Sequence, residues 1–147
     1  VYTTTGPRPD LDDRDAALLI GNEAMVKAAQ PAPYMYDLAD LWLRQTGYPV
    51  VFAVFAVRKE ALEQDEKQVR RVIDSYHRSL SCLAEEKETV VAKAREKYPD
   101  ILYDIDGYYD RFCFDFTPDL REAALFYFQQ AGDMGLLPQV KGIEYLN

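Results

Sequence analysis

VVFAVFAVR, residues 50–58, is the stretch of this sequence that decides the expected fold. Its residues are valine, phenylalanine and alanine, and no polar side chain interrupts either face before Arg58. A strand with two apolar faces is typical of a parallel sheet that is covered on both sides. The stretch therefore predicts a central parallel strand and an α/β architecture with a small parallel sheet.

A strand-turn-helix unit is predicted upstream of this strand. Residues 15–20 read DAALLI, an apolar run that ends at Gly21 and is interpreted as a second buried strand. Asn22 is the predicted N-cap of a helix over residues 24–29. A turn between a strand and a helix N-terminus collects unpaired N–H groups, which suit an anionic ligand. The same residues, with Glu23 facing the helix dipole, are also compatible with an ordinary helix cap.

Helices are predicted over much of the remaining sequence. Asp37 is the expected N-cap of a helix that ends at Gly47 in a left-handed C-cap. Apolar residues spaced by three and four predict two helices over residues 61–98, with a break near residues 81–86. Residues 99–116 are ambiguous between short helices and extended packing. A last helix is predicted to open at Thr117, Pro118 and Asp119 and to run to about Met134, with Gly135 as its cap. Residues 136–137 and 143–146 are expected to pack back as a final strand or an extended arm.

The sheet is expected to need more strands than this chain supplies. Two strands are too few for the predicted helices of the second half to cover. The sequence also begins with Val1. We interpret both features as indications of a missing N-terminal part of the same protein. The unpaired edges of an unfinished sheet also predict association with other chains, including a homodimer.

Composition excludes several classes of protein. The chain has 147 residues, enough for one domain or part of a larger one. It carries 17 basic and 25 acidic side chains for a net charge of -8, without a Lys/Arg stripe, so nucleic-acid binding is not expected. The longest apolar run covers residues 50–57, far short of the roughly 20 residues of a membrane-spanning helix. A globular protein without a membrane span is expected.

Cysteine and histidine are too sparse for a disulfide framework or a zinc site. Cys82 and Cys113 are the only cysteines and His77 is the only histidine. The cysteines are interpreted as reduced core residues of a cytoplasmic protein. Because no Cys-x-x-Cys or His-x-x-x-His pair exists, no metal site is predicted.

Three segments together resemble one known family. Residues 15–24, DAALLIGNEA, are similar to its strand-turn-helix "DAALLIGDEAL". Residues 36–49 and 51–58 resemble its segment "YDLGELWKEWTGLPFVFA". The family comprises the chorismate dehydratases of the futalosine pathway of menaquinone biosynthesis, with the dihydroxynaphthoate synthases as relatives. Its terminal helix and exit are matched by residues 108–109, 125–128 and 135–138.

The resemblance implies a two-lobed fold similar to type II periplasmic binding proteins, of which this chain is about the second half. Residues 1–49 would belong to the second lobe. Residues 50–58 would be the crossover strand, and residues 50–147 as a whole would return to the first lobe. The isolated chain is accordingly expected to be inactive.

The resemblance also implies a lyase that converts chorismate to 3-[(1-carboxyvinyl)oxy]benzoate without a cofactor. Such a reaction needs donors for the carboxylates of the substrate, a proton acceptor and exclusion of water. Carried over by motif, the expected substrate-binding residues are Gly21, Asn22, Thr46 and Gly47. The expected catalytic residue is Glu23.

Two positions depart from the family pattern. Asn22 stands where the family usually has Asp, and Phe55 stands where Trp is frequent. An amide at position 22 would weaken catalysis if that position takes part in proton transfer. Two alternatives therefore stay open: a non-catalytic module that binds small carboxylates, and a dihydroxynaphthoate synthase.

Overall fold

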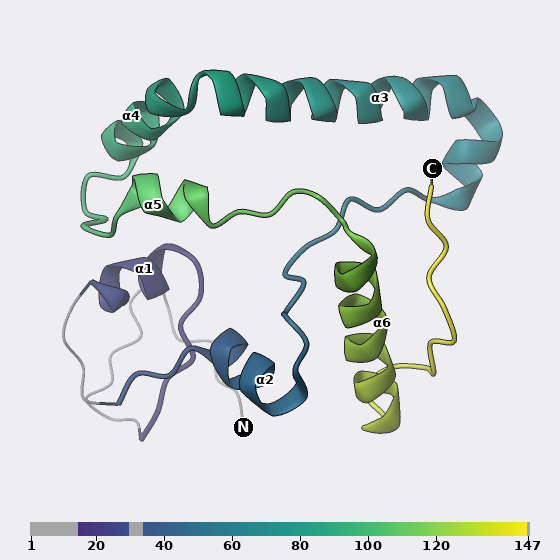
Figure 1. The fold of residues 1–147 in the computed structure, drawn as a ribbon, viewed down its shortest axis with the longest axis horizontal. Coiled ribbons are helices and arrows are strands. Elements are labelled where there is room, and N and C mark those ends of the chain that lie inside the picture. The colour runs from purple at the N-terminus through teal and green to yellow at the C-terminus, as the bar shows by residue number, and fades with distance from the viewer. Residues whose placement is uncertain (1–14, 30–33, 147) are drawn as a thin grey trace. The chain divides into compact units, whose positions relative to one another are not determined.

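The computed structural model describes residues 15–29 and 34–146, and all regular elements in these ranges are helices (Figure 1). The described chain divides into two compact units. Unit 1 contains α1, α4, α5 and the second part of α3, and unit 2 contains α2, α6 and the first part of α3. The helices are α1 (Asn22–Ala28), α2 (Leu38–Thr46), α3 (Lys59–Glu85), α4 (Lys87–Lys97), α5 (Ile105–Asp110) and α6 (Pro118–Asp133).

The predicted α/β fold, with a sheet like that of the periplasmic binding proteins, is wrong for the described residues, which contain no strand. Residues 51–58 form neither a helix nor a strand, and Phe52 is 84% exposed. Their apolar pattern expresses a preference for burial. A strand, however, also needs a neighbouring backbone about 4.8 Å away to complete its hydrogen bonds. Within the described part of the chain, no segment pairs with them as a strand.

The predicted strand at residues 15–20 is also absent. This segment is non-regular, and Ile20 is 84% exposed. The helix after it forms as expected. Its N-cap, however, lies one residue before Asn22, the predicted N-cap. Gly21 is the N-cap, and Asn22 is the first residue of α1. Gly21 takes this place with φ 64°, a positive angle that glycine adopts without the steric penalty of a Cβ atom.

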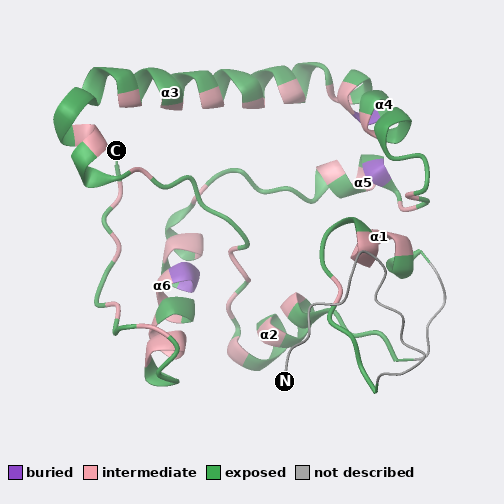
Figure 2. Ribbon diagram, turned by 180° about the vertical axis from the view of Figure 1, so that it is seen from behind, coloured by how far each residue is buried: buried purple, intermediate pink, exposed green. Residues whose placement is uncertain are grey.

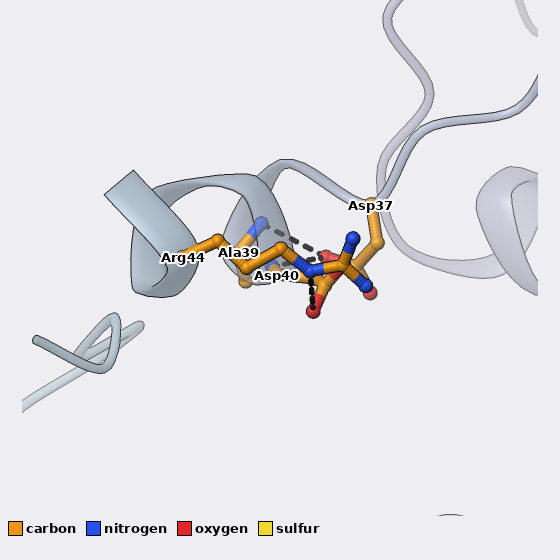
Figure 3. A network of polar contacts seen from close by, with 4 residues as sticks. All are labelled: Asp37, Ala39, Asp40 and Arg44. Atoms are coloured by element: carbon orange, nitrogen blue, oxygen red, sulfur yellow. Dashed lines mark hydrogen bonds and ion pairs between the residues drawn. The ribbon is translucent and has the colours of Figure 1, made fainter. Parts of the chain in front are cut away.

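Both ends of α2 follow the sequence prediction. The Asp37 carboxylate accepts hydrogen bonds from the N–H groups of Ala39 (2.8 Å) and Asp40 (3.2 Å) (Figure 3). Arg44, one turn later, pairs with Asp40 at 2.8 Å. Gly47 has φ 78° and closes the helix in the left-handed region. Local side-chain chemistry is therefore sufficient to define this helix.

Asp37→Ala is expected to lower the free energy of unfolding by about 1 kcal/mol, because two N–H groups lose their acceptor. Asp37→Asn is the matched control, since an asparagine oxygen can accept the same bonds and the two residues rank equally as N-caps. Urea denaturation followed by circular dichroism measures both variants. Equal losses in the alanine and asparagine variants would show that the carboxylate charge, and not the cap, is responsible.

The predicted break between two long helices is confirmed. α3 ends at Glu85, α4 begins at Lys87, and Glu86 between them has non-helical angles (φ -117°, ψ 25°). A second interruption, which was not predicted, lies at Asp65 (φ -153°, ψ 76°) inside α3. The Asp65 carboxylate accepts a hydrogen bond from the N–H of Gln68 at 2.9 Å, so it caps the longer second segment of α3.

α6 begins and ends as predicted. Thr117 caps it by accepting from the N–H of Leu120 at 3.4 Å, and Pro118 is its first residue. At the other end, the N–H of Leu136 donates to the carbonyl of Ala131, and that of Gly135 to Gly132, both at 2.9 Å. With Gly135 at φ 71°, this pair of bonds is a Schellman motif. An arm follows the helix. In it, the Tyr145 ring lies edge-on to the Phe116 ring, and the centroid of the Tyr145 ring is 4.5 Å from Cζ of Arg121.

Burial among the described residues is slight (Figure 2). Helices α4 and α5 pack against each other and bury Val91 and Ile105. In unit 2, α6 buries Ala123 and Ala124. Both cysteines are exposed, which corrects the prediction that they are core residues. Among the described helices, none combines the length and the apolar character needed to span a bilayer.

Candidate functional site

The turn at Gly21, Asn22 and Glu23 opens α1 in unit 1. The carbonyl of Gly21 accepts from the N–H of Met25 at 3.1 Å, which starts the helix. Gly21 and Asn22 are exposed, and Glu23 is half-buried. No side chain caps the helix, so its first N–H groups have no side-chain acceptor within the described chain. An acidic residue in this first turn is favourable for the helix dipole.

Thr46 and Gly47 lie at the C-terminal end of α2, in unit 2. The Thr46 hydroxyl donates to the carbonyl of Trp42 at 2.8 Å and accepts from the N–H of Tyr48 at 3.1 Å. The N–H of Gly47 donates to the carbonyl of Leu43 at 2.8 Å. Both donors are thus engaged in ending the helix. A role in substrate binding, which stays a prediction, would require the Thr46 hydroxyl to exchange one of these partners.

The five predicted site residues are divided between the two compact units. Gly21, Asn22 and Glu23 belong to unit 1, and Thr46 and Gly47 belong to unit 2. Within each unit, the predicted site residues are consecutive in the sequence, and the helix end on which they lie sets their geometry. The sequence motifs correctly identified two helix ends, one a start and one a finish.

An aromatic cluster in unit 2 brings together residues on both sides of Gly47 and residues of α6, and the sequence did not predict this grouping. It consists of Trp42, Tyr48, Phe126 and Tyr127. The Tyr48 ring stacks on Phe126 with 4.5 Å between centroids. The Trp42 ring lies 5.9 Å from Phe126 and 5.4 Å from Tyr127, both in tilted or edge-on arrangements. These contacts join α2 and the residues after it to α6.

The aromatic cluster contains one polar group that has a hydrogen-bond partner and one that has none among the described residues. The Tyr48 hydroxyl donates to Glu122 Oε1 at 2.8 Å. The Trp42 Nε1–H is buried and has no hydrogen-bond partner among the described residues. The Tyr48–Glu122 hydrogen bond raises the pKa of Tyr48, and the negative charge of Glu122 adds to that effect. The two residues are 74 positions apart, so no local pattern in the sequence could have identified them.

Tyr48→Phe is expected to change how stability depends on alkaline pH. Because the folded-state pKa of Tyr48 is raised above 10.0, the hydroxyl stabilises the folded state below pH 10 and this contribution is lost as pH rises through the folded-state pKa. The stability difference between the wild type and Tyr48→Phe should therefore shrink above pH 10. Urea denaturation between pH 8 and 11 measures it, with Tyr34→Phe, at a tyrosine that is 82% exposed, as control. A difference that stays constant with pH would contradict this expectation.

An ionic contact that sequence reasoning also missed joins α4 to α5 in unit 1. Lys87 Nζ pairs with Asp110 and, at 3.1 Å, with Asp106. The hydrogen bond to Asp110 is the main cause that raises the pKa of Lys87. The two aspartates, one turn apart on α5, are thereby held by the first residue of α4. These ion pairs link the start of α4 to α5.

Comparison with known proteins gives one finding about family. A family model described as menaquinone biosynthesis matches residues 2–133. No solved structure matches the chain. Within residues 15–29 and 34–146, no group of three or more His, Cys, Asp or Glu side chains is arranged to hold a metal ion.

Proposed function

The chain belongs to this menaquinone-biosynthesis family, and on that basis we propose that it supplies part of a lyase that dehydrates chorismate. The product would be 3-[(1-carboxyvinyl)oxy]benzoate, and the second product is water. The observation that carries the proposal is the family match over residues 2–133, which includes both motif-bearing helix ends. Family membership indicates an enzymatic role in menaquinone biosynthesis, and the lyase reaction is the specific proposal.

The proposed reaction removes one ring proton and one hydroxyl group from chorismate. The C–H bond breaks and its proton goes to a carboxylate, for which Glu23 is the candidate. The C–O bond breaks as the ring becomes aromatic, and the departing hydroxyl takes up a proton to leave as water. The atoms balance without an oxidant or a reductant. Aromatisation of the ring provides the driving force, so the protein has to orient the substrate and accept the proton.

The start of α1 is the feature that supports a binding role for Gly21 and Asn22. Chorismate carries two carboxylates, and N–H groups at a helix start favour a negative charge. The first turn of α1 presents such groups without a side-chain cap. Asn22 is exposed at this point, so its amide is accessible to a hydroxyl or a carboxylate of the ligand.

Asn22 is also the observation that favours a second candidate, a non-catalytic module that binds small carboxylates. An asparagine amide donates and accepts hydrogen bonds but does not take up a proton at neutral pH. If the aspartate usual in the family moves a proton, this chain would retain binding and lose turnover. The two candidates differ in a single measurable property, the consumption of chorismate.

The test is to incubate the full-length gene product with chorismate and to follow substrate and product by liquid chromatography with mass spectrometry. Formation of the enolpyruvyl-benzoate product supports the lyase. Binding of chorismate by calorimetry without its consumption supports the non-catalytic module. Asn22→Asp restores the residue usual in the family and is the informative companion variant. If chorismate is neither bound nor consumed, the lyase is excluded, and so is a non-catalytic module whose ligand is chorismate.

Asn22→Ala is expected to weaken chorismate binding by about 0.5–1.5 kcal/mol, or by roughly 1.5–3 kcal/mol if the amide contacts a carboxylate. The reason is the loss of one hydrogen bond to the ligand. Calorimetric titration of the full-length gene product measures the change. Gln68→Ala, at an exposed residue of α3, is a control for loss of a side-chain amide away from the predicted site residues. Unchanged affinity in Asn22→Ala would mean that the turn is an ordinary helix start.

A further inference from the structure

We draw no further inference here: the strongest candidate, the apolar stripe along α3 formed by Val69, Ile73, Leu80 and Leu83, is a helix face for which nothing in the structure shows what covers it.

Discussion

Ala123→Asp is expected to lower the free energy of unfolding at pH 7 by about 4 kcal/mol. Ala123 is 1% exposed in α6, so an aspartate there would lose its contact with water. The least costly response of the buried carboxyl is to become protonated. For a group with an ordinary pKa of about 3.9, neutralisation at pH 7 costs roughly 1.36 kcal/mol for each of about three pH units. A loss of this size is a large fraction of the stability of a typical domain, roughly 5–15 kcal/mol.

Ala92→Asp is the matched control for this substitution. Ala92 is the sixth residue of α4, as Ala123 is the sixth residue of α6, but Ala92 is exposed. Both variants have the same helix-propensity cost, less than about 1 kcal/mol, and only Ala123→Asp buries a carboxyl group. Urea denaturation followed by circular dichroism compares them. Equal effects at pH 7 would contradict the burial of Ala123.

The pH dependence of Ala123→Asp provides a second check. Burial would raise the folded-state pKa of the new carboxyl above its unfolded-state value. The destabilisation is then fully present above the folded-state pKa and disappears as pH falls below the unfolded-state value, near 4. The deficit relative to the wild type should therefore shrink between pH 7 and pH 4. A deficit that is independent of pH would indicate that packing, and not charge, is its cause.

Glu23→Gln is expected to lower kcat for chorismate dehydration by about 10²–10⁴-fold, the usual contribution of a general base. This expectation rests on the proposed lyase function. Glutamine has nearly the shape of glutamate, but its amide does not accept a proton at neutral pH. Glu23 is half-buried in the first turn of α1, beside the residues proposed to bind the substrate. KM should change much less than kcat, because substrate binding does not depend on proton transfer.

Glu88→Gln is the control for Glu23→Gln. Glu88 is the second residue of α4, as Glu23 is the second residue of α1, so both substitutions remove an acid from the positive end of a helix. Initial rates of product formation over a range of chorismate concentrations give kcat and KM for both variants. If the two variants retain the same kcat, Glu23 does not act in catalysis and serves only as a favourable first-turn acid.

Helix ends were the best predicted part of this protein. Asp37 and Gly47 bound α2, and Thr117 and Gly135 bound α6, as the sequence indicated. These features are local because a cap forms between a side chain and a backbone group only a few residues away. The family resemblance was likewise confirmed, by a match over residues 2–133. Motifs at helix ends and family membership could therefore both be identified without coordinates.

The two predicted strands were the part of the fold that sequence reasoning predicted wrongly. Residues 51–58 have strand-like composition, yet they form no strand among the described residues. β-Propensity describes how a residue fits a pleated, half-buried surface, and that surface must be supplied by other segments. Buried positions were also hard to predict: Ala123 and Ala124 are buried, while Phe52 is exposed. The hydrophobicity of these residues therefore did not predict which of them are buried.

By itself, the sequence determined the family, through motifs spread over much of the chain. It also determined the ends of α2 and α6 and a break near residues 81–86, because these features depend on residues within a few positions of one another. Only the tertiary structure decided which distant residues meet. Tyr48 binds Glu122 across 74 positions, and Trp42 packs against the rings of α6. Such contacts depend on where whole helices lie in space. Many sequence patterns allow them, and only the folded chain selects among them.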